Sequence, residues 1–335
     1  MKKKKFVLTI FCMILISVTG CQKSENYKMT KASKNDVLPI YEQNAEELQG
    51  VSELQILQDV YKSGYKFEEW LIEGVEEPGG ILALEEAFLV SDRENDCIFK
   101  VDNNGNIIDE IGQTGSGNGE FLKPSALAVY NHEIYVLDQG NNRIQILDED
   151  LVYDREIKLK DTKTEDPNYI PQNIAVNQEG VFVTGVSLEN PVVDRYTEEV
   201  DEIGSNFIGS MSTYDNQMYF INSMVRYYDK ENDSFGAVSI APEWLLVAKD
   251  KKMEKICELP YGFNITSFCV DEKGILCVSV SGGAVYRLNK DGVYEETIAC
   301  LPGLQDEEAT QMAVDDQESV YIVMPNAKKI YRCYK

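Results

Sequence analysis

The stretch Gly112–Asp148 reads GQTGSGNGEFLKPSALAVYNHEIYVLDQGNNRIQILD. A Gly-rich turn opens it, and three short apolar runs follow at 126–129, 134–137 and 144–147. Polar turn residues separate the runs. Short runs rich in β-branched residues between turn residues are typical of a β-meander, so the stretch predicts three consecutive antiparallel strands.

The same pattern of an apolar run, a turn and a second apolar run occurs six times in the chain. The second runs are 88–92, 134–138, 181–184, 218–221, 275–278 and 320–323. A repeat with a period of roughly 40–50 residues indicates radial repetition, because one unit alone cannot bury its two faces. The last unit ends after its third strand. Residues Tyr65–Trp70 precede the first unit, and we expect them to supply the missing fourth strand and close the ring.

The quoted stretch resembles the NHL repeat, which is the blade unit of one β-propeller family. The resemblance is carried by Phe121, Pro124, Ala128, Val129, Ile134, Tyr135, Val136, Asp138, Asn142, Arg143 and Ile144. It implies an all-β fold: a six-bladed β-propeller of four-stranded antiparallel blades, formed by residues 63–335 as one domain.

Residues 1–20 have the composition of a targeting segment. Lys2–Lys5 are basic, and Phe6–Val18 form an apolar run that is too short for a comfortable membrane span of about 20 residues. The run ends in Val-Thr-Gly-Cys21, which resembles the lipobox of bacterial lipoproteins. The resemblance implies cleavage before Cys21 and lipidation of that residue. An ordinary signal peptide with an incidental Cys21 is the alternative.

This interpretation gives three regions: a signal peptide at 1–20, a lipidated Cys21 with a polar tether at 21–62, and the propeller. It predicts a bacterial cell-envelope protein, anchored by lipid on the extracytoplasmic side of a membrane. The formal charge of −25 opposes binding to phosphate backbones, so we expect no nucleic-acid partner.

Six cysteines remain once Cys12 is removed with the signal peptide and Cys21 is lipidated. Cys269 and Cys277 flank a short turn, and strand alternation places their side chains on opposite faces of the sheet. We expect most of the six to be buried apolar residues and leave open one disulfide between neighbouring blades. The six are Cys97, Cys257, Cys269, Cys277, Cys300 and Cys333.

The residues favour binding over catalysis. The single histidine, His132, lies in a predicted turn, and it cannot alone supply a histidine metal site or a histidine-driven lyase. Acidic residues are plentiful, but no spaced set marks a calcium site. We therefore expect no cofactor and keep calcium as a possibility. The GSGNG run lies between strands, which does not suit a dinucleotide loop.

Two groups of polar and aromatic residues make up the candidate binding face. The first lies in the loops after the second strands: Arg93, Asn95, Gln139, Asn141, Asn142, Arg143 and Asn326. In the loop that contains Gln139–Arg143, we expect Asp138 and Arg143 to pair and to shape the loop. The second lies in an insertion of about twenty residues between Asn222 and Glu243: Met224, Arg226, Tyr227 and Tyr228. This insertion is either a functional loop or an extra β-hairpin packed on the edge of the blade.

The function these observations predict is a non-catalytic module that binds a protein or a glycan on this face. The alternative is a calcium-dependent hydrolase of the lactonase type, which rests on fold analogy and the acid surplus.

Overall fold

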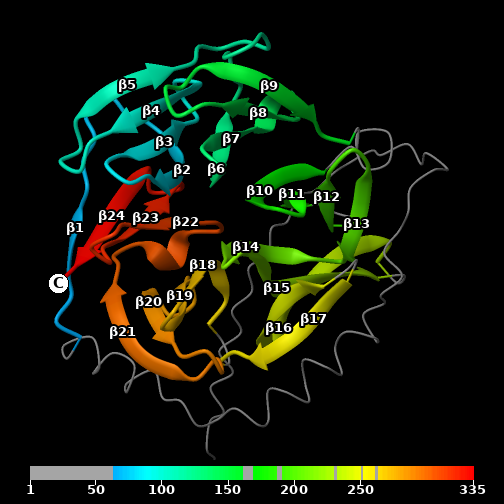
Figure 1. Cartoon of the computed structure of the whole chain (residues 1–335). Helices are drawn as coiled ribbons and strands as arrows, with labels where there is room; N and C mark the ends of the chain where they lie inside the picture. Colours follow the sequence, from blue (N-terminus) through cyan, green and yellow to red (C-terminus); the bar gives the residue numbers. More distant parts are fainter. Residues whose placement is uncertain (1–62, 161–168, 187–190, 230–231, 250–251, 261–262) are drawn as a thin grey trace, which may run out of the picture.

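The computed structural model describes residues 63–160, 169–186, 191–229, 232–249, 252–260 and 263–335. The predicted signal peptide, Cys21 and the tether lie outside them. The described residues form six four-stranded antiparallel sheets arranged in a ring, which is a six-bladed β-propeller (Figure 1). No helix in this part of the chain is long and apolar enough to span a bilayer.

The blades follow one another along the chain, and each begins at the centre of the ring. The first contains β2 (Pro78–Ala83), β3 (Phe88–Asp92), β4 (Cys97–Val101) and β5 (Ile107–Ile111). The second contains β6 (Pro124–Tyr130), β7 (Glu133–Asp138), β8 (Arg143–Leu147) and β9 (Tyr153–Lys158). The third contains β10 (Ile170–Asn177), β11 (Gly180–Val186), β12 (Val192–Tyr196) and β13 (Val200–Ser205).

The remaining blades repeat this order. The fourth contains β14 (Ile208–Tyr214), β15 (Gln217–Asp229), β16 (Ser234–Lys249) and β17 (Lys252–Glu258). The fifth contains β18 (Ile265–Asp271), β19 (Gly274–Ser279), β20 (Ala284–Leu288) and β21 (Tyr294–Cys300). The sixth contains β22 (Gln311–Val314), β23 (Val320–Met324), β24 (Lys329–Tyr334) and β1 (Lys66–Glu69).

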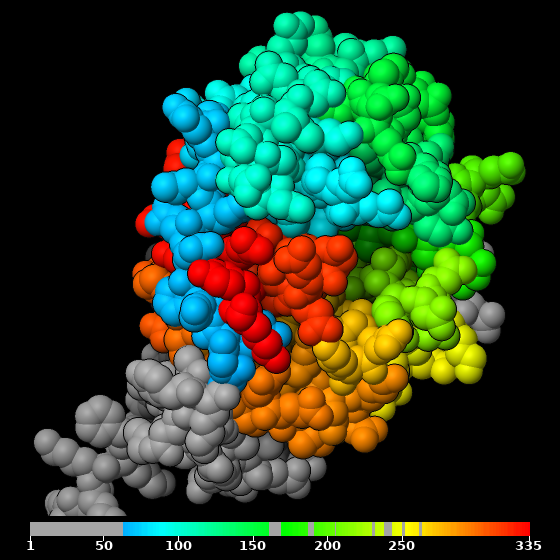
Figure 2. Space-filling model, turned by 60° about the vertical axis from the view of Figure 1, so that its left-hand side comes forward, coloured from blue at the N-terminus to red at the C-terminus, as the bar shows by residue number. Residues whose placement is uncertain are grey.

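The sixth blade draws its strands from both ends of the described chain. β1 pairs antiparallel with β24, with Lys66 opposite Tyr334 and Glu69 opposite Tyr331. Figure 2 shows the two segments side by side, β1 in blue and the C-terminal strands in red. Every side chain of β1 is exposed, so this strand contributes to the blade mainly through its backbone hydrogen bonds.

Apolar side chains fill the spaces between adjacent blades. Where the sixth blade meets the first, Trp70 follows β1 and packs edge-on against Phe88 and Tyr321, with ring centroids 5.1 and 4.9 Å away. Trp70, Phe88 and Tyr321 are all buried. Because aromatic side chains bury large areas, this contact stabilises the junction between the sixth and the first blade.

The insertion in the fourth blade is a β-hairpin, as in the second alternative, but it does not form a separate hairpin at the edge of the blade. It extends the second and third strands of the blade: β15 pairs with β16 from Met224 opposite Ser239 to Asp229 opposite Ser234. Asn206 holds its base, since its amide nitrogen donates to Arg226 O at 2.9 Å and its Oδ1 accepts from Arg226 N at 2.6 Å.

The six cysteines of the propeller are free. Cys269 lies opposite Leu276 and Cys277 opposite Phe268, as expected from strand alternation. Cys97, Cys277 and Cys333 are buried, and Cys257, Cys269 and Cys300 are half-buried. Burial raises the pKa of the Cys97 and Cys333 thiols to about 12, so these two side chains act as buried apolar groups.

Candidate functional site

The ring has two faces because successive turns of a meander alternate between the ends of its strands. The upper face carries the turns after the second strands and the connections between blades. The lower face carries the turns that join the first strand of each blade to the second. All residues of the predicted binding face therefore belong to the upper face.

Arg143 does not belong to an accessible binding face, which corrects the prediction for this residue. Its side chain is 7% exposed, and its Nε donates to Asp138 Oδ2 at 2.8 Å. Its terminal nitrogens donate to Glu156 at 2.8 Å and to the carbonyls of Gly117 and Glu120 at 2.7 and 2.9 Å. A buried guanidinium requires such partners. The expected Asp138–Arg143 pair is thus confirmed as the element that shapes this loop.

Three asparagines of the predicted face also hold loops. Asn141 Nδ2 donates to Asp138 at 2.9 Å and to Gly115 O at 2.8 Å. Asn142 adopts φ 54°, which asparagine tolerates better than most residues, and donates to Lys160 O at 3.3 Å. Asn95 donates to Asp92 at 2.9 Å. Their side chains are committed to local structure.

Gln139 and Arg93 form a link between blades at the upper face. Arg93 Nη2 donates to Gln139 Oε1 at 3.5 Å, and Gln139 Nε2 donates to Pro171 O at 2.7 Å. These contacts join the first three blades. Since Pro171 is in the innermost strand β10, the link lies beside the entrance of the central channel.

The other predicted residues lie in separate places on the upper face. Asn326 is exposed in the turn of the sixth blade, where its Nδ2 donates to Asp306 O at 3.0 Å. Met224, Arg226, Tyr227 and Tyr228 are half-buried on the hairpin of the fourth blade. There the Tyr228 and Phe235 rings lie 5.2 Å apart. The structure therefore does not bring all the predicted residues into one site.

The centre of the ring contains a cavity of about 390 Å³, which all six innermost strands line. Five of these strands carry a register shift, or bulge, near their upper ends: Pro78/Gly80, Pro124/Leu127, Pro171/Asn173, Ile208/Gly209 and Ile265/Ser267. Bulges redirect side chains and are common beside functional sites.

Polar side chains gather in the upper part of this cavity, and we call them the channel-mouth group. Its members are Asn173, Ser210, Thr266, Ser267, Thr310 and Gln311. Gln311 Nε2 donates to Asn173 Oδ1 at 2.5 Å, and this bond crosses the channel because β22 and β10 belong to opposite blades. The Thr310 hydroxyl lies 2.7 Å from those of Thr266 and Ser267.

No residue of the channel-mouth group was predicted from the sequence to bind a ligand. The available signal was a short polar segment directly before the first apolar run of several units, such as Asn173 before Ile174 and Thr310-Gln311 before Met312. That signal does not show which strands face one another across the ring.

The one charged side chain in the lining of the central cavity lies at the lower end of the cavity. Among its lining residues, Asp271 is the only acid, and it pairs with Arg287 at 2.5 Å. Within the described part of the chain, no three His, Cys, Asp or Glu side chains are placed to hold a metal ion. His132 is 86% exposed in a lower-face turn and lies 2.8 Å from Glu149.

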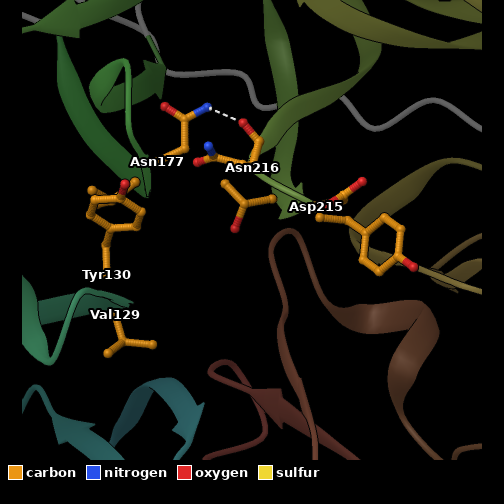
Figure 3. Close-up of a pocket in the computed structure, with 8 residues that line it drawn as sticks. Val129, Tyr130, Asn177, Asp215 and Asn216 are labelled. Carbon is orange, nitrogen blue, oxygen red and sulfur yellow. Dashed lines mark hydrogen bonds between the residues drawn. The ribbon is translucent and has the colours of Figure 1, made fainter.

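A second pocket, of about 330 Å³, opens on the lower face between three blades. Figure 3 shows Tyr130 and Asp215 on different sides of it, with Asn177 donating to Asn216 O at 3.1 Å. The pKa of Tyr214, which also lines it, is raised by burial and by the carboxylates of Glu272, Asp215 and Asp271. The residues of this pocket lie apart from the predicted binding face.

Known proteins share this architecture. A family model described as a 6-bladed beta-propeller matches residues 69–232. The curated proteins contain no match to the chain. The structure of a luciferin-regenerating enzyme is similar, with a TM-score of 0.54 at 11% identity over 81% of this chain and 96% of that one.

Two bacterial structures are similar as well. Virginiamycin B lyase from Staphylococcus aureus gives a TM-score of 0.52 at 12% identity, over 81% of this chain and all 100% of that one. A putative exported protein from Bacteroides fragilis gives 0.50 at 13% identity, over 77% and 83% of the two chains. At these identities the likeness concerns the fold alone, and by fold the chain is a six-bladed β-propeller.

Proposed function

We propose that the chain is a membrane-anchored extracytoplasmic lipoprotein of the NHL-repeat type whose upper face is a non-catalytic binding module for a protein or a glycan. The channel-mouth group carries this proposal. It places uncharged donors and acceptors from four blades at the centre of the upper face, inside a cavity of about 390 Å³. Concave sites with a few convergent polar groups are the usual form of a ligand site.

The surroundings of the cavity support binding. Arg93 and Gln139 link the loops of the first three blades on the upper face, outside the cavity lining, and the aromatic hairpin of the fourth blade projects from the same face. Tyrosine, arginine and methionine are enriched in recognition surfaces. The lipobox-like Val18–Cys21 and the polar segment after it support anchoring through Cys21.

The calcium-dependent hydrolase has less support. Two similar structures are named as a lyase and as a luciferin-regenerating enzyme, but only the fold relates them to this chain. Calorimetric titration of the chain with calcium tests this alternative. Tight binding, together with turnover of a lactone or phosphoester at about one per second or faster, would replace the binding proposal.

The binding proposal is tested by photo-crosslinking in intact bacterial cells. A photoreactive side chain at Glu94, an exposed upper-face residue, is compared with one at Ile108, an exposed residue on the outer strand β5. We expect a specific adduct from position 94 alone. Equal adducts, or none, would contradict a binding role of the upper face. The anchor is tested separately by Cys21→Ala, which should release the protein from the membrane fraction.

A further inference from the structure

We propose that the channel-mouth group is a subsite for an uncharged carbohydrate. This inference rests on the proposed binding function and specifies the chemistry of the ligand. It depends on three observations: the amide pair that crosses the channel, a buried hydroxyl that lacks a partner, and the absence of charge among the lining residues at the upper end of the cavity.

The amide pair retains hydrogen-bonding capacity that none of the described residues uses. A side-chain amide offers two N–H donors and an oxygen with two lone pairs, and the Gln311–Asn173 bond uses one donor and one lone pair. Both residues are half-buried and line the cavity, so their remaining donors and acceptors are within reach of a ligand there. Adjacent donors and acceptors on planar amides match the paired hydroxyl groups of a sugar ring.

Ser210 supplies the second observation. It lines the cavity, is 4% exposed, and its hydroxyl has no hydrogen-bond partner among the described residues. A buried polar group without a partner lowers stability, so a ligand that pairs with it gains affinity. By contrast, the Thr310 and Ser267 hydroxyls at the fifth and sixth blades already pair with each other.

The electrostatics select against a charged ligand. The one charged side chain that lines the cavity, Asp271, ends β18 on the lower face, and it is already paired with Arg287. An ionic ligand at the upper end would lose hydration without gaining a counter-charge. A neutral molecule with many hydroxyl groups meets uncharged amides and hydroxyls there, and the cavity falls in the size range of sites for small ligands.

The experiment uses the full chain in detergent and calorimetric titration with neutral tetrasaccharides: chitotetraose, cellotetraose and maltotetraose. Tetragalacturonate serves as the charged comparison. We expect at least one neutral probe to bind, and tetragalacturonate to bind at least about tenfold more weakly. Ser210→Ala and Asn173→Ala should each weaken binding by about fivefold or more, which is the loss typical of one hydrogen bond.

Ser125→Ala is the matched control. The Ser125 hydroxyl is also buried without a partner among the described residues, but Ser125 is absent from the cavity lining. Both serine variants should keep or slightly raise the melting temperature, and Ser210→Ala alone should weaken binding. If Ser210→Ala lowers the melting temperature and leaves the affinity unchanged, the hydroxyl has a structural role and the subsite is wrong.

The outcomes also separate this inference from the proposed function. If no neutral probe binds while the photoreactive side chain at position 94 captures a polypeptide, the carbohydrate subsite is overturned and the binding module stands. If neither test detects a ligand, both proposals are overturned.

Discussion

Arg143 shows how one buried charge determines the form of a loop. Its guanidinium binds Asp138 on its own loop, Glu156 on β9, and two carbonyls of the Gly-rich segment before β6. Removal of the guanidinium leaves the Asp138 carboxylate, which is fully buried, without its counter-charge. Breaking a buried pair from one side is far more costly than losing an exposed pair.

Arg143→Ala should therefore lower the free energy of unfolding by about 3–5 kcal/mol, measured by urea denaturation. The control is Arg155→Ala. Arg155 also pairs with a carboxylate, Glu133, but its side chain is 48% exposed, so the expected loss is below about 1 kcal/mol. Equal losses in the two variants would show that the buried network does not hold the loop.

Glu243 is a buried acid at the base of the hairpin. It is 3% exposed; its Oε1 accepts from Ile265 N of the next blade at 2.9 Å, and its Oε2 has no partner among the described residues. Burial raises the pKa of this carboxyl to about 7. The folded chain thus holds the proton more tightly than the unfolded chain does.

This shift makes stability depend on pH. The pKa of this carboxyl is near 4.5 in the unfolded chain, so Glu243 lowers the stability of the wild type as pH rises from about 4.5 to about 7. Glu243→Gln should have nearly wild-type stability at about pH 4 and be more stable by roughly 3 kcal/mol above pH 7. Urea denaturation across this range measures the difference. If the difference in stability between Glu243→Gln and the wild type does not change with pH, the raised pKa of Glu243 is wrong.

The elements of the fold could be predicted better than the site. Each strand pairs within its own blade, so its period-two pattern and its turns are local signals; the second strands predicted at 88–92 and 134–138 are β3 and β7. In the fourth blade an insertion was expected between Asn222 and Glu243, but β15 continues to Asp229 and β16 begins at Ser234, because the hairpin extends both strands.

The channel-mouth group could not be predicted because it depends on the whole ring. Asn173 and Gln311 are 138 residues apart and meet only once opposite blades are in place. Conversely, Asn141, Asn142 and Arg143 were chosen for their polarity, which indicates a loop but does not show that their side chains turn inward.

Deletion of β1 tests whether this strand holds the whole ring closed. A chain that starts at residue 71 lacks β1 and Trp70, and it should lose melting temperature in one cooperative transition, since the sixth blade loses its outer strand and the aromatic contact to Phe88. A chain that starts at residue 63 is the control. Equal melting temperatures for the two, measured by circular dichroism, would show that β1 does not hold the ring closed.

The whole molecule carries 57 acidic and 32 basic side chains, and this surplus opposes compaction. Raising sodium chloride from about 10 mM to about 0.2 M shortens the Debye length from about 30 Å to below 10 Å. We expect the melting temperature to rise by a few degrees. Potassium chloride should act alike, because the effect is screening. A fall in melting temperature with salt would show that attractive ion pairs outweigh the repulsion.

The pairing of β1 with β24 also has a consequence for how the protein is made. A ribosome synthesises β1 more than two hundred residues before its partner β24. β1 therefore stays unpaired until β24 has been made. Native pairing over such a separation is slow, and the unfinished ring exposes a strand edge meanwhile. Loss of residues 330–335 would remove most of β24, so closure of the propeller requires synthesis through this strand.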